Sequence, residues 1–213
     1  MIITKLEPFD RREKEFKKSV KRNAKVRVYI DDCYAFPFYI SELKGYGLEE
    51  GSELTDSAYE ALQDIVLQHA KQKALSLLKF MDRTESELRN RLSEDGIPKE
   101  VIQSTIEYVL HYGYLNDERY TVNYIRQRKE TKSKRIIKAE LTGKGINSEL
   151  IEMLFAAEYQ EQEEDPEITA IKKAISKKGK EPNSLSREEK QKLMAQLYRK
   201  GFELDKIKKL IDY

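Results

Sequence analysis

Leu141-Thr142-Gly143-Lys144-Gly145-Ile146 is the second of three copies of one short pattern. The first copy is Leu92-Ser93-Glu94-Asp95-Gly96-Ile97, and the third is Leu197-Tyr198-Arg199-Lys200-Gly201-Phe202. Each copy has a leucine, three mostly polar residues, a glycine and an apolar residue, and the copies recur about every fifty residues. A period of that length is typical of stacked helical repeats, which present extended binding surfaces.

Helix-capping residues frame each copy. Thr84 with Glu87, and Ser186 with Glu189, match the capping box, and Ser133 can cap a helix of the middle copy. The pattern glycines suit the left-handed conformation that ends helices. These signals predict a mainly α fold, with three tandem three-helix repeats in an elongated curved array and a small N-terminal β-hairpin segment. The expected domains are an N-terminal β segment at 1–52 and helical repeats at 53–113, 114–160 and 161–213.

The N-terminal segment shows the alternation of β-strands. Apolar and polar residues alternate over 26–30, the acidic pair Asp31-Asp32 follows, and residues 34–40 are aromatic and extended. This order predicts a hairpin with an acidic turn. Pro37 lacks an N–H group, so its strand is expected at a sheet edge. Residues 2–6 can supply a third strand.

Composition limits the classes of function. Charged residues make up 37% and hydrophobic residues 39% of 213 residues, and one cysteine with two histidines offers neither an internal disulfide nor a zinc site. No Ser-His-Asp or Cys-His set is available, and Gly143-Lys144-Gly145 lacks the rest of a phosphate loop. We therefore expect a non-enzymatic, cofactor-free cytoplasmic monomer without a membrane segment.

Charge is segregated although the net charge is only +2. Residues 126–144 contain eight basic residues against two acids, whereas residues 158–167 contain six acids and no base. Such a basic block favours a surface for phosphates or an acidic protein over a merely solvated helix face. Tyr120 and Tyr124 lie just upstream at helical spacing, which is more typical of core packing than of base stacking.

Several segments resemble the RecX family, the bacterial regulators of the RecA recombinase. The resemblance covers residues 70–213 and rests on DRTESEL at 82–88, GYLNDERY at 113–120, ELTGKGI at 140–146 and RKGF at 199–202. The hairpin resembles an extension found in some members. Members often have glycine at the positions of Asp32 and Ser133, but aspartate tolerates a left-handed turn and serine caps helices.

The resemblance implies a role in DNA repair, recombination and the SOS response. A member is expected to bind the groove of the RecA–DNA filament, limit its extension and lower its activities. The alternative from the residues alone is a direct binder of single- or double-stranded DNA that uses its three-helix modules and basic surface. The candidate partner-binding residues are Arg126, Arg128, Lys132, Lys134, Arg135, Lys138 and Lys144, with Asp117, Glu118 and Arg119 shaping the preceding turn.

Overall fold

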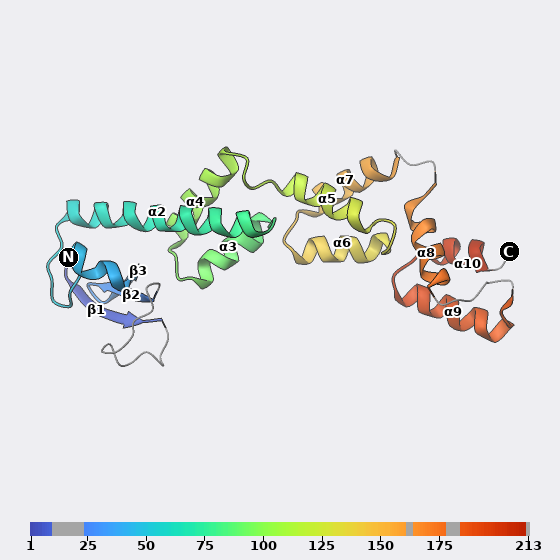
Figure 1. Cartoon of the computed structure of the whole chain (residues 1–213), viewed down its shortest axis with the longest axis horizontal. Coiled ribbons are helices and arrows are strands. Elements are labelled where there is room, and N and C mark those ends of the chain that lie inside the picture. The colour runs from blue at the N-terminus through green and yellow to red at the C-terminus, as the bar shows by residue number, and fades with distance from the viewer. Residues whose placement is uncertain (10–23, 161–163, 178–183, 212–213) are drawn as a thin grey trace. The chain divides into compact units, whose positions relative to one another are not determined.

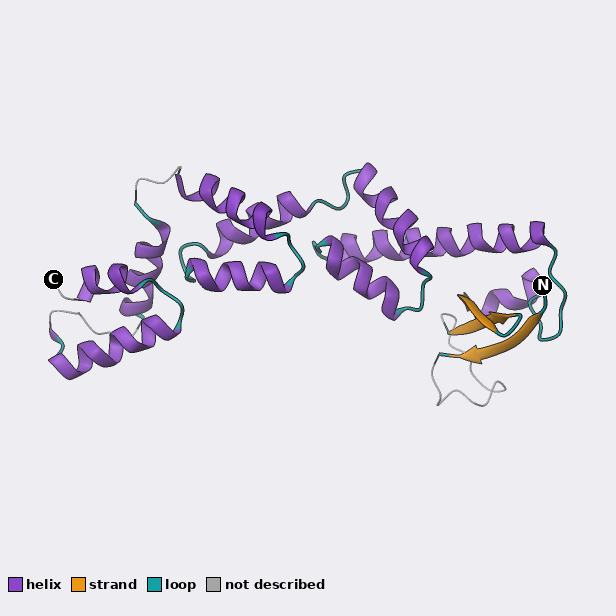
Figure 2. Cartoon of the chain, turned by 180° about the vertical axis from the view of Figure 1, so that it is seen from behind, coloured by secondary structure: helices purple, strands orange, loops and turns teal. Residues whose placement is uncertain are grey.

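The structure is a computed structural model that describes residues 1–9, 24–160, 164–177 and 184–211. Two compact units, residues 1–115 and 116–213, divide the chain. Residues 1–25 contain nine basic residues against four acids, and Gly179 and Pro182 predict a loop at 177–185. Most of both segments lies outside the described residues. The strands of the described part all belong to the first unit, and the second is helical (Figure 2).

The N-terminal segment forms an antiparallel sheet with the order β1-β2-β3. Its strands are β1 (Ile3–Pro8), β2 (Lys25–Ile30) and β3 (Cys33–Tyr39). Asp31 and Asp32 connect β2 to β3 with φ angles of 48° and 65°, the left-handed pair that a two-residue hairpin turn needs. The predicted hairpin, its acidic turn and the third strand are therefore confirmed. Pro37 lies on β3, an outer strand of the sheet, as its missing N–H requires.

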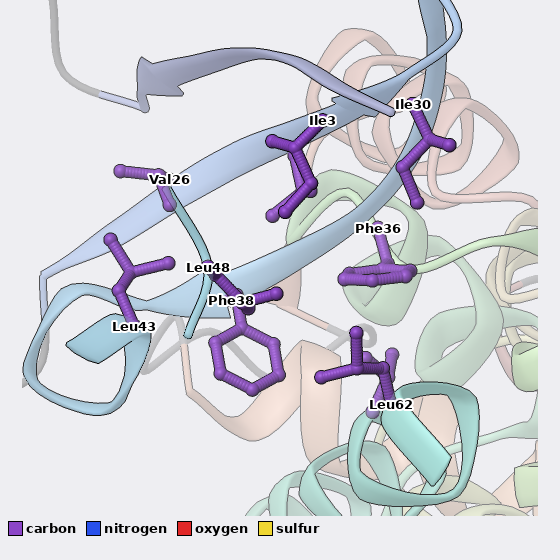
Figure 3. Close-up of a cluster of buried hydrophobic side chains, with 10 residues drawn as sticks. Ile3, Val26, Ile30, Phe36, Phe38, Leu43, Leu48 and Leu62 are labelled. Carbon is purple, nitrogen blue, oxygen red and sulfur yellow. The ribbon is translucent and has the colours of Figure 1, made fainter. Parts of the chain in front are cut away.

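One face of this sheet packs against a long helix, α2 (Asp56–Phe80), as Figure 1 shows. Along the chain, α1 (Ile40–Leu43) and the short 3₁₀ helix η2 (Lys44–Tyr46) come between β3 and α2. Phe36 and Phe38 point from β3 toward Leu62 of α2, and all three side chains are buried (Figure 3). The alternation of apolar residues along the strands thus supplies one half of a core, and the first turns of α2 supply the other.

The first repeat is formed by the second half of α2, α3 (Glu85–Glu94) and α4 (Lys99–His111). Thr84 and Glu87 make the predicted capping box at the start of α3. Gly96 follows α3 with a φ of 77°, and its carbonyl accepts a hydrogen bond from the hydroxyl of Tyr34 on β3. The glycine turn of this repeat therefore also contacts the sheet.

The second and third repeats make up the second unit. The helices of the second are α5 (Asp117–Arg128), α6 (Lys134–Gly143) and α7 (Ser148–Gln160), and those of the third are α8 (Pro166–Ser176), α9 (Arg187–Arg199) and α10 (Leu204–Ile211). Each repeat has its own buried apolar cluster, centred on Leu141 and Phe155 in one and on Leu197 and Ile207 in the other. The mainly helical fold of three three-helix repeats behind a small sheet is confirmed, while the proposed domain limits stay predictions.

The third repeat contacts the second through its own glycine turn. Ser133 caps α6 by accepting a 3.3 Å hydrogen bond from the N–H of Ile136, and its hydroxyl donates to the carbonyl of Lys200 at 2.8 Å. Gly201, with a φ of 82°, lies so close that an added Cβ would stand 2.7 Å from the Ser133 hydroxyl oxygen. The serine therefore has two roles, a helix cap and a joint between repeats.

Candidate functional site

Helix α5 carries two stacked tyrosines with cations beside them. The rings of Tyr120 and Tyr124 lie 5.9 Å apart between centroids and only 23° from parallel. The guanidinium of Arg128 lies 3.7 Å from the Tyr124 centroid, and the Lys144 ammonium lies 5.7 Å from the Tyr120 centroid and 5.9 Å from that of Tyr124. Residues four apart share a helix face, so the sequence spacing of 120, 124 and 128 builds this stack directly.

A carboxylate completes this surface. The Tyr124 hydroxyl donates a 2.9 Å hydrogen bond to Glu140 of α6, and the Lys132 ammonium forms an ion pair with the same carboxylate. The hydrogen bond from Lys132 lowers the pKa of Glu140, whereas burial, followed by the bond to Glu140, raises the pKa of Tyr124. We call the resulting surface the tyrosine–cation face; it consists of Tyr120, Tyr124, Arg128, Lys132, Glu140 and Lys144.

A different carboxylate, Glu158 of α7, holds two other cations. Its side chain is only 8% exposed and accepts from Arg126 Nη2 at 2.7 Å and from Lys129 Nζ at 3.3 Å. The same lysine donates to the Glu158 carbonyl at 3.1 Å and is itself buried. The hydrogen bond from Arg126 lowers the pKa of Glu158. Buried charges persist when they are paired in this way, so this group ties α5 to α7.

The cations of α6 lie against α7 and beside the third repeat. Lys134 lies 5.5 Å from the Phe155 ring centroid, and Lys138 lies equally far from it while forming an ion pair with Glu152. Arg135 is exposed, and an added Cβ at Gly201 would stand 3.0 Å from its Nε. These three residues therefore do not join the tyrosine–cation face.

The predicted turn residues Asp117, Glu118 and Arg119 form the first turn of α5. Asn116 caps this turn, accepting a 2.7 Å hydrogen bond from the N–H of Arg119. Two acids at a helix N-terminus interact favourably with its dipole. The structure thus places these residues at the start of the helix that carries the tyrosines, and their contact with a partner stays a prediction.

The structure therefore brings Arg128, Lys132 and Lys144 together and leaves the other predicted cations elsewhere on the second repeat. The sequence did not reveal that Glu140 and Glu158 pair with different cations of the basic block, Glu140 with Lys132 and Glu158 with Arg126 and Lys129. Glu158 lies 32 positions from Arg126, so no local spacing reveals the pair. The stack was readable from the spacing of the tyrosines, and their partial burial against the repeat core confirms the expected packing role.

Other kinds of site find no support in the part of the chain that the structure describes. There, no cluster of three or more histidine, cysteine, aspartate or glutamate side chains is arranged to hold a metal ion. Among the same residues, no helix combines the length and apolar character needed to cross a bilayer.

Comparison with known proteins gives matches along nearly the whole chain. The first, second and third three-helix domains of RecX match residues 70–108, 116–153 and 165–211, respectively. Regulatory protein RecX of Caldanaerobacter subterraneus is 30% identical over 194 residues, which cover 90% of this chain and 94% of the relative. Regulatory protein RecX of Bacillus subtilis is 28% identical over 90% of this chain and 73% of the relative.

A solved structure is similar over the same extent. A crystal structure of regulatory protein RecX aligns with a TM-score of 0.60 at 27% identity, and the alignment covers 99% of this chain and 98% of the other. The three domain matches follow the order of the three repeats seen in the fold. This chain belongs to the RecX family, whose members are regulatory proteins and not enzymes.

Proposed function

We propose that this protein is a mainly negative modulator of the RecA recombinase. It binds in the groove of the RecA–DNA filament and limits the extension and the activities of that filament. The second repeat makes the central contact through its basic residues. The observation that carries this proposal is the tyrosine–cation face, a polar and aromatic surface on a chain of the RecX family.

The composition of this face suits protein recognition. Tyrosine and arginine are the residues that most often dominate the energy of protein interfaces, because each offers a large contact area and a directional polar group. Arg128 and Lys132 are both partly accessible, and the tyrosines beneath them are fixed by packing in the repeat core. Because these tyrosine side chains are already fixed, they lose little conformational entropy when a partner binds.

The proposal is tested with the DNA-dependent ATP hydrolysis of RecA on single-stranded DNA. The wild-type chain should inhibit hydrolysis at concentrations well below that of RecA, since capping or blocking a filament affects many subunits. R128E should raise the concentration needed for half-inhibition about tenfold, the equivalent of roughly 1.4 kcal/mol. Hydrolysis that persists unchanged at equimolar wild-type protein contradicts the proposed function.

The test must also distinguish binding to the RecA filament from direct binding to DNA. A protein that acts by covering phosphates loses affinity steeply as salt rises, whether or not RecA is present. The inhibition should therefore be compared with binding to the same DNA alone over a series of salt concentrations. Inhibition that occurs only at concentrations that saturate the free DNA identifies DNA binding as the activity.

A further inference from the structure

We propose that the tyrosine–cation face is a carboxylate-binding surface for an acidic segment of the protein partner, and that Glu140 occupies this surface in the unbound chain. The inference rests on the proposed function and names the chemistry of the surface that the partner must present. The face lies on α5 and α6, with Lys132 between these helices and Lys144 directly after α6. Figure 1 shows α5 and α6 as neighbouring helices, so the face is complete within the second unit.

The contacts of Glu140 define the recognition chemistry. One carboxylate oxygen accepts from the Tyr124 hydroxyl at 2.9 Å, and the other is paired with the Lys132 ammonium. A hydroxyl and an ammonium that donate to separate oxygens form a two-point clamp for a carboxylate. Any acidic side chain that replaces Glu140 in this clamp gains the same pair of hydrogen bonds.

The charges of the face favour a second carboxylate. Arg128 and Lys132 contribute two positive charges beside the negative charge of Glu140, and Lys144 lies near both tyrosine rings. Arg128 also acts electrostatically on both Glu140 and Tyr124, and Lys144 acts on Tyr124. Arg128 therefore keeps a positive charge beside the Tyr124 ring while Glu140 is paired with Lys132, and this charge favours the approach of an acidic segment.

The exposure of Glu140 makes it exchangeable. Its side chain is 32% exposed and that of Lys132 is 39% exposed, so a partner can reach the clamp. Glu158, by contrast, is 8% exposed and holds the buried Lys129, so exchange there would leave a buried cation without its carboxylate. Exposed ion pairs are worth little, so the cost of displacing Glu140 is small.

The arrangement fits a protein carboxylate better than a nucleic-acid backbone. A phosphate chain needs cations along its path, but Lys134 and Lys138 lie over Phe155 on α7, and Lys138 is paired with Glu152. The cations of the face are confined to the few turns around the two tyrosine rings. One or two carboxylates of a folded partner match this length, whereas a strand of phosphates extends beyond it.

The decisive variant is E140Q. Glutamine keeps an acceptor for the Tyr124 hydroxyl but removes the internal charge that competes for Lys132. E140Q should bind preformed RecA–DNA filaments about two- to fivefold more tightly than the wild type, and should bind an acetylated, amidated oligoglutamate peptide more tightly by a similar factor. R128Q should weaken binding to both the filaments and the peptide, so its effect on affinity is opposite to that of E140Q.

A matched control is E164Q. Glu164 pairs with Lys172 at 2.5 Å in the third repeat, so this change also releases one exposed lysine from a carboxylate. It should leave both affinities unchanged, because Lys172 does not belong to the face. Denaturant unfolding of each variant checks that the folded population is the same.

The outcomes separate the inference from the function on which it rests. Wild-type protein that fails to bind filaments overturns the proposed function and this inference with it. Wild-type binding with unchanged or weaker binding of E140Q overturns the inference alone. An equal gain of E140Q for filaments and for oligo(dT) without RecA also overturns it, since the surface would then recognise phosphate.

Discussion

The hydroxyl of Ser133 donates a hydrogen bond of 2.8 Å to the carbonyl of Lys200, 67 positions further along the chain. The bond joins the N-terminus of α6 in the second repeat to the glycine turn that follows α9 in the third. Because Arg135 is also close to that turn, the same joint positions one of the predicted partner-binding cations. Substitutions at this joint should therefore lower the free energy of unfolding.

Gly201→Ala should destabilise the protein by about 2–4 kcal/mol. A left-handed φ of 82° costs an alanine roughly 1–2 kcal/mol, and its Cβ would in addition stand 2.7 Å from the Ser133 oxygen. Urea unfolding followed by circular dichroism measures the loss.

Gly113→Ala is the matched control for this substitution. Gly113 has a similar φ of 69°, but an added Cβ there would meet no atom within 4 Å beyond its immediate chain neighbours. It should lose only the backbone contribution of roughly 1–2 kcal/mol. Equal losses for the two variants would show that the contact with Ser133 contributes nothing.

Glu158→Gln should destabilise the protein by about 1–3 kcal/mol. The change removes the charge that both Arg126 and Lys129 require, and Lys129 is buried. The value stays below that of a fully buried pair because the Arg126 side chain is 58% exposed. Denaturant unfolding at neutral pH provides the measurement, with Glu164→Gln expected to stay within about 0.5 kcal/mol of the wild type.

The same carboxylate predicts how stability depends on acid. The pKa of Glu158 is lower in the folded chain than the ordinary 4.5, because Arg126 hydrogen-bonds its ionised form. The corresponding stability is therefore fully present above the unfolded pKa and is lost as pH falls through the lower, folded pKa. The free energy of unfolding should decline less steeply below about pH 4.5 in Glu158→Gln than in the wild type. Parallel pH profiles of the two proteins would refute this assignment.

Tyr34→Phe should cost about 0.5–1.5 kcal/mol, since it removes the hydroxyl that donates to the Gly96 carbonyl. Burial raises the pKa of Tyr34 to about 12, so the neutral hydroxyl is favoured in the folded chain. Its stabilising effect is present below the unfolded pKa of about 10 and is lost as pH rises through the folded value. Absorbance titration of tyrosine in alkali should lose one late-ionising group, with a pKa of about 12, in the variant.

Much of the fold could be predicted because its signals are local. The capping boxes at Thr84 and Ser186, the left-handed glycines Gly96 and Gly201, and the acidic hairpin turn each depend on residues a few positions apart. Local spacing fixes these features, and the structure has them where they were predicted.

The candidate site was less predictable because charge pairing is set by packing. The basic block was evident from composition, but Glu158 reaches Arg126 only because α7 packs against α5. Glu140 lies 16 positions from Tyr124, on the next helix, and no periodicity links the two. A count of charges therefore located the basic surface without showing which cations are neutralised within the chain.

The two glycine turns described here give the chain a direction of assembly. The turn at Gly96 docks onto Tyr34, and the turn at Gly201 docks onto Ser133, so each meets a residue that comes earlier in the sequence. During synthesis the receiving surface has therefore already left the ribosome when the turn emerges. Each of these modules can settle onto its predecessor without waiting for the rest of the chain, which shortens the time that its apolar helix faces are exposed to other proteins.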